Sequence, residues 1–277
     1  MALPDFIIIG AQKSGTSWLG SCLRQRDDVF VHRGEIHYFN DDRNYNRGPG
    51  WYETHFSEAR DDVLVGEKTP NYLPNCVSVG QPERIKDLLP DVKLVAIVRD
   101  PVERAISSYR HLRQRGRVSA RMSIDSALHQ MMNDGHWAIG FGYYYRHVLD
   151  YHRVFDPQRL LVLGYEADIT QAPDAALASV EAHLGLDPGF DYKNLDRKVN
   201  VSSYSRALLL ANRCLKSPRF RDLATRADRA LKLPALDDRP SRATVDRLAA
   251  LYETENERLF DLIGKRFEWT TASGSST

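Results

Sequence analysis

The sequence predicts an α/β fold, in which a parallel sheet has helices on both faces. Five short apolar runs bounded by turn residues have the length of strands. Most of them do not alternate apolar with polar residues, a pattern typical of parallel strands buried on both faces. The five runs are residues 6–9, 29–32, 63–65, 94–98 and 160–163. Segments with helical periodicity lie between these runs, and this alternation favours a doubly wound sheet.

The expected helices follow the strands along the chain and then continue alone. Helical patterns between the strands cover residues 16–24, 82–89, 102–115, 143–155 and 173–184. After about residue 190 only helices are expected, at roughly 203–216, 219–231 and 242–263. We expect this C-terminal helical segment to pack on the sheet, so that residues 1–270 form a single domain. Residues 271–277 are small and polar, and they predict a flexible tail.

The composition excludes several classes of protein. The chain has 277 residues, of which 42% are hydrophobic, so it can bury a core and is not mainly disordered. Lys and Arg total 38 and Asp and Glu total 37, a net charge of +1. This balance argues against a general nucleic-acid binder. The three cysteines, Cys22, Cys76 and Cys214, are widely spaced and support neither a disulfide framework nor a structural zinc site.

The N-terminal residues carry no readable targeting signal. The segment MALPDFIIIG lacks a basic region, and its apolar run of four residues ends at Gly10. No apolar stretch approaches the roughly 18 residues that a membrane-spanning helix needs. We therefore expect a soluble protein of a reducing compartment, located in the cytoplasm, with no membrane partner.

A turn that can bind phosphate follows the first expected strand. In FIIIGAQKSGTSWL, residues 6–19, a buried strand reaches Gly10 and a helix begins near Gly15 or Thr16. Backbone N–H groups at such a helix start suit an anion. The two glycines have P-loop spacing, but Thr16 stands where a Walker A loop has its lysine, and Lys13 lies two residues before Gly15. Chance spacing is the alternative. The displaced lysine favours a 5′-diphosphate-like ligand with no γ-phosphate and no required metal.

A second strand, turn and helix supports this interpretation. In LVAIVRDPVERAISSY, residues 94–109, Arg99 stands at the carboxyl end of a strand, where open α/β sheets bind ligands. An arginine binds phosphate through two charge-assisted hydrogen bonds, and Ser107 lies in the first turns of the next helix. Asp100 could be read as a magnesium ligand at the end of a Walker B strand. We favour a role as a helix cap.

Together the two segments resemble the sulfotransferases that depend on PAPS (3′-phosphoadenosine 5′-phosphosulfate). The run QKSGTSWL looks like the 5′-phosphosulfate loop of that family, and RDPVERAISSY looks like its 3′-phosphate segment. The resemblance implies PAPS as co-substrate, 3′,5′-ADP as product, no metal and a P-loop-like sheet. It also implies the following nucleotide contacts: Lys13, Ser14, Gly15, Thr16, Ser17, Trp18, Arg99 and Ser107.

Within that family the chain is most similar to the heparan sulfate type, over most of residues 5–269. The segments that carry the likeness are GEIHYF at 34–39, GWYETHF at 50–56, GEKTPNY at 66–72, GYYYRHVLDYHRVF at 142–155 and LYETENERLFDLIGKRFEW at 251–269. The stretch from about 200 to 240 departs, because it has neither the cysteine-closed loop nor the Lys-Gly-Arg segment of that type. Lys198, in LDRKVNVSSYSR, is the expected second contact of the 3′-phosphate.

The resemblance also implies the catalytic residues. Lys13 would neutralise charge on the bridging oxygen as 3′,5′-ADP leaves. Glu35, in GEIHYF, corresponds to the family's catalytic glutamate and would take the proton of the acceptor hydroxyl. His37 would face the same side as Glu35 if the stretch is extended, and would orient Glu35 or bind the acceptor. Lys68, in GEKTP, would lie near the reacting oxygens. A surface position is the alternative for Glu35, and a structural histidine is the alternative for His37.

Two further clusters allow either a functional or a structural role. An arginine run, with Arg110, Arg113, Arg115, Arg117 and Arg121, predicts either an electropositive wall for an acidic acceptor or a solvated helix end. The tyrosines at 143–145 could stack on an acceptor, but their helical spacing predicts that most are core residues.

The predicted activity is transfer of a sulfuryl group from PAPS to a hydroxyl of a carbohydrate or small metabolite. One alternative is a P-loop kinase or NTPase that uses ATP and magnesium, against which the position of Lys13 argues. The other is a nucleotide-binding module without catalysis, which would have no need of Glu35 and Lys68.

Overall fold

A computed structural model of the chain describes residues 3–76, 80–119, 121–196, 217–231 and 238–272, together with residues 205, 207, 208 and 211. The chain divides into two compact units. Unit 1 comprises Met1–Asp100, Tyr143–Val199 and Thr254–Trp269, and unit 2 comprises Pro101–Gly142, Asn200–Glu253 and Thr270–Thr277. The single domain expected over residues 1–270 stays a prediction, and the tail expected at 271–277 lies beyond the described residues from 273 onward.

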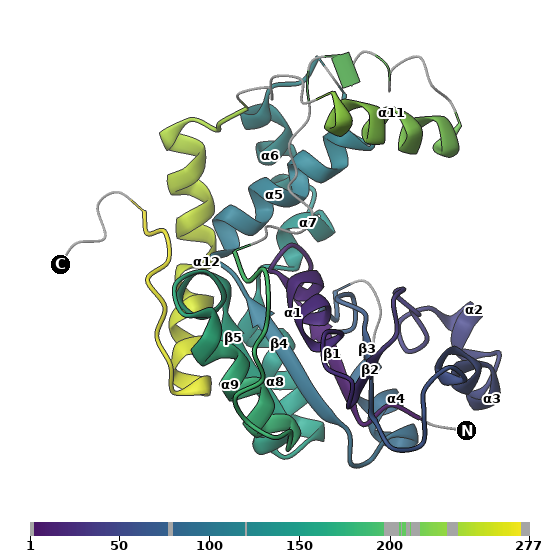
Figure 1. Cartoon of the computed structure of the whole chain (residues 1–277). Helices are drawn as coiled ribbons and strands as arrows, with labels where there is room; N and C mark the ends of the chain where they lie inside the picture. The colour runs from purple at the N-terminus through teal and green to yellow at the C-terminus, as the bar shows by residue number, and fades with distance from the viewer. Residues whose placement is uncertain are drawn as a thin grey trace. The chain divides into compact units, whose positions relative to one another are not determined.

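The core of unit 1 is a five-stranded parallel sheet, which confirms the predicted fold class (Figure 1). The strands lie in the order β2-β3-β1-β4-β5. Their bounds are β1 Phe6–Gly10, β2 Val29–Val31, β3 Leu64–Lys68, β4 Lys93–Val98 and β5 Leu160–Gly164. All five residues of the central strand β1 are buried, as its uninterrupted apolar run predicts. Each predicted strand is present, with its ends shifted by three residues at most.

Helices cover both faces of this sheet. Side chains of Ile7 and Ile9 on β1 belong to one apolar core, and those of Phe6 and Ile8 belong to another, because successive side chains of a strand point to opposite faces. The first core includes residues of α3 Pro49–Glu53, α4 Gln81–Leu88, α8 Tyr144–Val154 and the end of α12 Arg242–Ile263. The second includes residues of α1 Thr16–Leu23 and α9 Pro173–Leu184.

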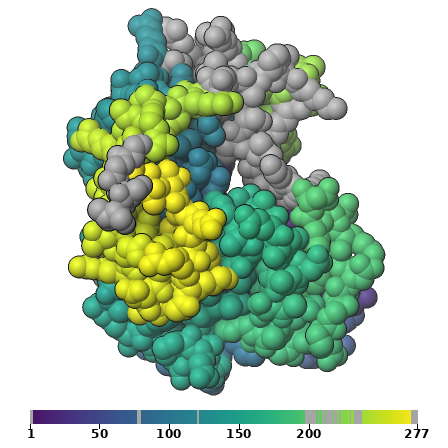
Figure 2. Space-filling model, turned by 90° about the vertical axis from the view of Figure 1, so that its left-hand side faces the viewer, coloured from purple at the N-terminus to yellow at the C-terminus, as the bar shows by residue number. Residues whose placement is uncertain are grey.

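Only the last part of the C-terminal segment, Thr254–Trp269, belongs to the unit that holds the sheet and packs on it, whereas Asn200–Glu253 belongs to unit 2. Leu259 and Phe260 of α12, followed by Phe267 and Trp269, join the first core together with Tyr144 of α8. In Figure 2 the yellow C-terminal residues lie beside the teal surface. The aromatic rings of Phe267 and Trp269 stack with their centroids 5.2 Å apart.

Several short elements in unit 1 are absent from the sequence prediction. They are α2 Asp42–Tyr45, α3, the 3-10 turns Thr54–Phe56 and Pro157–Arg159, and a π-helical turn at Tyr165–Thr170. Each has six residues or fewer. A segment of that length spans fewer than two turns, so it shows no recognisable helical period.

Unit 2 is helical in its described part. It contains α5 Pro101–Gln114, α6 Ile124–Asn133, α7 Trp137–Gly140, α11 Pro218–Ala230 and the first part of α12. Within it Arg104 is fully buried and donates to Ser108 Oγ at 3.1 Å and to the Ala138 carbonyl. The helix predicted near 203–216 lies almost wholly outside the described residues. Among the described residues, no helix combines the length and apolar character that crossing a membrane requires.

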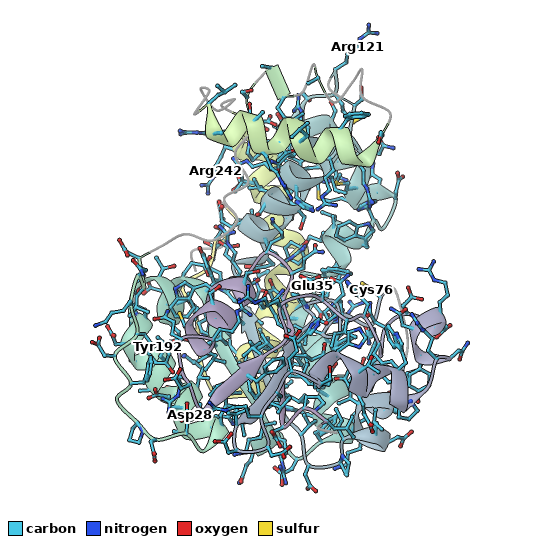
Figure 3. The ribbon with its side chains drawn as sticks, turned by 45° about the vertical axis from the view of Figure 1, so that its right-hand side comes forward. Asp28, Glu35, Cys76, Arg121, Tyr192 and Arg242 are labelled. Atoms are coloured by element: carbon cyan, nitrogen blue, oxygen red, sulfur yellow. The ribbon has the colours of Figure 1, made fainter. Side chains whose placement is uncertain are left out.

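The arginine run of unit 2 is partly structural. Arg113 is 7% exposed and pairs with Asp238 at 2.8 Å, and Arg110 donates to the Asp238 carbonyl at 2.9 Å. These two arginines therefore hold residue 238 against α5. Arg121, by contrast, is exposed and points outward from unit 2 (Figure 3).

Candidate active site

Loops with charged side chains meet at one edge of the unit 1 sheet. Since the strands are parallel, the carboxyl ends of neighbouring strands lie at the same edge, which is where open α/β sheets bind ligands. Strand β1 leads into the loop with Lys13, β3 ends at Lys68, and β4 is followed directly by Arg99. Strand β5 is followed by Tyr165 and Glu166. Three of the predicted site residues therefore share this edge.

The loop between β1 and α1 has the backbone of an anion-binding turn. Lys13 has a φ of 73° and Gly15 a φ of 92°, so both residues have a left-handed backbone conformation. A Cβ at Gly15 would also lie 2.9 Å from the ring of Tyr165. Helix α1 begins at Thr16 with no side chain capping its N-terminus. In its first turn the Trp18 N–H donates to the Gly15 carbonyl at 2.9 Å, and the helix dipole favours an anion beside the N-terminus.

The Ser14 side chain in this loop fits a phosphate. It is fully buried, and within the described ranges its Oγ has no hydrogen-bond partner. A buried hydroxyl without a partner is costly, and an anion that accepts its proton would remove that cost. The residues present therefore fit a nucleotide phosphate.

Trp18 has a packing role in this structure. Its indole lies in the second core, its Nε1 donates to the Leu195 carbonyl at 2.9 Å, and its backbone N–H donates to Gly15 at 2.9 Å. Both N–H groups of Trp18 are thus already bound within unit 1. The nucleotide contact expected for this residue stays a prediction.

The structure brings Glu35, His37 and Lys68 together. Lys68 Nζ lies 3.0 Å from Glu35 Oε1, and His37 Nε2 lies 3.5 Å from Glu35 Oε2. The Lys68 side chain is 7% exposed, and its stem lies beside Gly20 of α1. Glu35 is 42% exposed, so its carboxylate remains accessible beside Lys68 and His37. His37 thus lies beside Glu35, and its role in orienting Glu35 or binding the acceptor stays a prediction.

His37 reaches Glu35 through a turn, and not through the extended stretch that the sequence analysis considered. The stretch around His37 is not extended, because His37 has a φ of 55° and the chain turns there. This turn, rather than the two-residue repeat of a strand, directs the imidazole back toward Glu35. The other ring nitrogen, Nδ1, lies 3.2 Å from Asn40 Oδ1.

The two neighbours keep Glu35 ionised. Burial raises the pKa of its carboxyl, but the hydrogen bond from His37 and the Lys68 ammonium outweigh burial and lower the pKa to about 2. The same contact with Glu35 raises the pKa of the His37 imidazole, against the effect of its burial. The group is thus a carboxylate held between two proton donors.

We expect Lys68→Met to raise the pKa of Glu35 toward its ordinary value near 4.5. The substitution keeps an apolar stem and removes the ammonium, so the carboxylate loses its nearest cation. Because the pKa of Glu35 is lowered in the folded state, its contacts stabilise the fold above pH 4.5, and this contribution is lost as the pH falls toward 2. A carbon-detected NMR titration of the Glu35 carboxyl measures the change. An unchanged titration in Lys68→Met would contradict the pairing.

Arg99 has a partner that the sequence analysis missed. Its Nε lies 3.3 Å from Glu166 Oε1, its guanidinium stacks over the Tyr165 ring at 4.9 Å, and its Nη1 donates to the Lys13 carbonyl at 3.4 Å. Burial raises the pKa of Glu166. Arg99 therefore links the β1, β4 and β5 loops. Since Glu166 follows β5 as Arg99 follows β4, the rule of strand ends gives the signal that could have found it.

Two predicted contacts lie elsewhere. Ser107 is on α5 in unit 2, half-buried and next to the buried Ser108. Lys198 lies outside the described residues. Neither prediction is decided by the geometry of unit 1. The tyrosines at 143–145 are mainly structural, since Tyr144 is fully buried and its hydroxyl accepts from the Arg99 backbone N–H at 3.4 Å.

Within the described ranges, no three His, Cys, Asp or Glu side chains gather in a way that could hold a metal ion. Cys22 is buried and Cys76 is exposed, while Cys214 lies outside the described residues. A reaction without a metal stays a prediction from the position of Lys13.

Known proteins are similar to this sequence over most of its length. The family described as "Sulfotransferase domain" matches residues 3–214. This chain belongs to the sulfotransferase domain family. The prediction of a PAPS-dependent sulfotransferase of the heparan sulfate type is confirmed at the level of the family. It follows that the chain is an enzyme of the sulfuryl-transfer class.

The similar sulfotransferases include two mammalian proteins. Mouse heparan sulfate glucosamine 3-O-sulfotransferase 6 is 30% identical over 274 residues, which are 96% of this chain and 73% of that protein. Human heparan sulfate glucosamine 3-O-sulfotransferase 3B1 is 36% identical over 187 residues, which are 66% of this chain and 46% of that protein. The chain thus spans less than half the length of the second relative.

A solved bacterial sulfotransferase has the same fold. The sulfotransferase from Alicyclobacillus acidocaldarius aligns with a TM-score of 0.69 at 23% identity, over 96% of this chain and 98% of that chain. The sulfotransferase fold assigned from the sequence is therefore confirmed.

Proposed function

We propose that this sulfotransferase transfers the sulfuryl group of PAPS to a hydroxyl of a glycan acceptor, with Glu35 as general base. The observation that carries the proposal is the Glu35 carboxylate between Lys68 at 3.0 Å and His37 at 3.5 Å, accessible to a ligand on unit 1. A carboxylate held ionised by two donors accepts a proton without first having to lose one. A module that only binds nucleotides has no need of this arrangement.

Bound PAPS would supply the sulfuryl group and a good leaving group, and the protein residues would supply position and charge. The N–H groups at the start of α1 and the Ser14 hydroxyl would hold the 5′-phosphate. Lys13 would neutralise the charge that develops on the bridging oxygen. Arg99 would bind the 3′-phosphate through its guanidinium.

Glu35 and Lys68 would also activate the acceptor hydroxyl and support its attack. Glu35 would take the hydroxyl proton while the oxygen attacks sulfur in line with the leaving oxygen. Lys68 would stabilise the charge that develops on the reacting oxygens. Similarity to enzymes that are named for heparan sulfate favours a glycan over another small metabolite. The cytoplasmic location expected from the sequence stays a prediction.

Calorimetric titration tests the donor site. We expect 3′,5′-ADP to bind tightly, and ADP or ATP with magnesium to bind at least tenfold more weakly, because Arg99 binds a 3′-phosphate. Arg99→Ala should lower the affinity for 3′,5′-ADP about tenfold and leave the affinity for ADP unchanged. Arg60→Ala is the matched control, at an exposed arginine that pairs with Asp62 and the Asp27 carbonyl.

The same titration separates the alternatives. Preference for ATP with magnesium would contradict the proposal and favour the kinase. In another outcome, the protein binds 3′,5′-ADP tightly and transfers no labelled sulfuryl group from PAPS to any acceptor, heparan sulfate included. That result would favour the binding module.

A further inference from the structure

The proposed reaction makes no use of a fully buried carboxyl beside Lys68. Glu67 is 0% exposed and receives hydrogen bonds from three hydroxyls. Tyr52 donates to Oε1 at 2.5 Å, and Thr69 and Tyr72 donate to Oε2 at 2.9 and 3.5 Å. Burial raises the pKa of Glu67 to about 7, against the effect of these three hydrogen bonds. When the carboxyl is ionised it only accepts, so all three hydroxyl protons then point toward Glu67.

Two of these hydroxyls accept hydrogen bonds from the segment that carries Glu35 and His37. The Ile36 N–H donates to Thr69 Oγ1 at 3.1 Å, and the Tyr38 N–H donates to the Tyr72 hydroxyl at 2.9 Å. A hydroxyl whose proton is given to Glu67 keeps its lone pairs free to accept from these N–H groups. Glu67 therefore sets the direction of both contacts.

The segment needs this support because of its backbone. The two N–H groups flank His37, whose φ of 55° lies in a region that residues with a Cβ rarely adopt. Such a conformation persists only where the surroundings hold it. Here the hydrogen bonds on either side of His37 hold the turn that directs its imidazole to Glu35.

The supporting residues are themselves fixed to the sheet. The Thr69 N–H donates to the Ile8 carbonyl at 3.1 Å, and the Leu73 N–H donates to the Ile9 carbonyl at 2.8 Å. Glu67 pairs in register with Ile7 of the central strand. The Thr69 and Tyr72 hydroxyls thus connect residues 35–38 to β1.

We propose that Glu67 is a positioning residue, which acts through the Thr69 and Tyr72 hydroxyls to hold residues 35–38 in the conformation that places His37 against Glu35. Its importance for turnover rests on the proposed function. The contact itself does not, and it is testable in the free protein.

Two buried tyrosines give a matched pair for the test. Tyr52→Phe and Tyr72→Phe each remove one hydroxyl that donates to Glu67, and both rings are 0% exposed. Of these two hydroxyls, that of Tyr72 also accepts a hydrogen bond from a backbone N–H of residues 35–38, and that of Tyr52 does not. We expect NMR titration of the His37 imidazole to give a lower pKa in Tyr72→Phe and an unchanged pKa in Tyr52→Phe.

Comparing Tyr72→Phe with Tyr52→Phe controls for the effect of other groups near His37 on its pKa. The groups that face it are Glu35, Asn40, Glu67 and Asp41, with Lys68 behind Glu35. Tyr52→Phe removes the shorter hydrogen bond to Glu67, 2.5 Å against 3.5 Å for Tyr72, so a change in the charge of Glu67 would shift His37 at least as much in Tyr52→Phe as in Tyr72→Phe. Equal shifts in both, or no shift in Tyr72→Phe, would overturn the proposal.

A second variant serves if Tyr72→Phe does not fold. Thr69→Val keeps the shape of the side chain and removes the oxygen that accepts the Ile36 N–H. It should also lower the pKa of His37, and an unchanged pKa in this variant would overturn the proposal as well.

Turnover gives an independent measure with labelled PAPS and heparan sulfate as the acceptor probe. We expect Tyr72→Phe to lower kcat about tenfold with unchanged affinity for 3′,5′-ADP, since a displaced catalytic group loses rate rather than donor binding. Tyr52→Phe should stay within twofold of the wild type. Equal losses in the two variants would indicate a structural role only. Wild-type protein inactive on heparan sulfate would count against the proposed function, and the His37 titration would still decide the role of Glu67.

Discussion

Glu35→Gln is expected to lower kcat by about 10³-fold while leaving the affinity for 3′,5′-ADP unchanged. General-base catalysis contributes roughly 10²–10⁴-fold, and glutamine keeps the shape of the side chain but cannot take the proton. The donor contacts of the 11–15 loop do not involve Glu35, so donor binding should not respond. Transfer from labelled PAPS to heparan sulfate and calorimetry with 3′,5′-ADP measure the two quantities.

Glu83→Gln is the matched control for this substitution. Glu83 is an exposed glutamate in the first turn of α4, so its loss should not change kcat. Wild-type turnover in Glu35→Gln would remove Glu35 from the role of base, and His37 would become the remaining candidate at that position.

Lys13→Ala is expected to lower kcat by about 10²–10³-fold and also to weaken binding of 3′,5′-ADP. Removing one preorganised group that stabilises developing charge costs a rate of this order. Unlike Glu35, Lys13 lies in the loop that would hold the 5′-phosphate, so the ground state loses a cation as well. Single-turnover kinetics with labelled PAPS separates the rate of transfer from the loss of affinity.

Lys86→Ala on α4 controls for a general loss of positive charge, since its ammonium donates to the Pro90 carbonyl away from the loop. A variant Lys13→Ala that lost affinity but kept the wild-type rate of transfer would assign Lys13 to binding alone.

The fold could be predicted from the sequence because short apolar runs mark its strands. The five residues of β1 are all buried and β4 has a similar run, whereas β3 is apolar only at its start and ends at Glu67 and Lys68. The edge of the sheet that holds Lys13, Lys68 and Arg99 follows from parallel strands. The short helices α2 and α3 could not be predicted, because segments of four and five residues have no measurable period.

The site was predicted less completely, for physical reasons. Glu35 and Lys68 are 33 residues apart in the chain, and only a resemblance to a family indicated that they meet. The left-handed backbone of His37 depends on the Thr69 and Tyr72 hydroxyls, which are tertiary contacts that no local pattern encodes. Glu166 was missed although its place after β5 made it a neighbour of Arg99.

The Lys68 ammonium gives the proposed reaction a means of timing. In the free protein this cation is bound to Glu35, and with His37 it makes the carboxylate a very weak base. With PAPS bound, negative charge would grow on the bridging oxygen of the leaving group, and the ammonium would be drawn toward it and away from the carboxylate. Glu35 would then become more basic as the attacking hydroxyl becomes more acidic. A single cation would thus keep the base inactive until sulfuryl transfer has begun, and so would discourage proton abstraction in the absence of a donor.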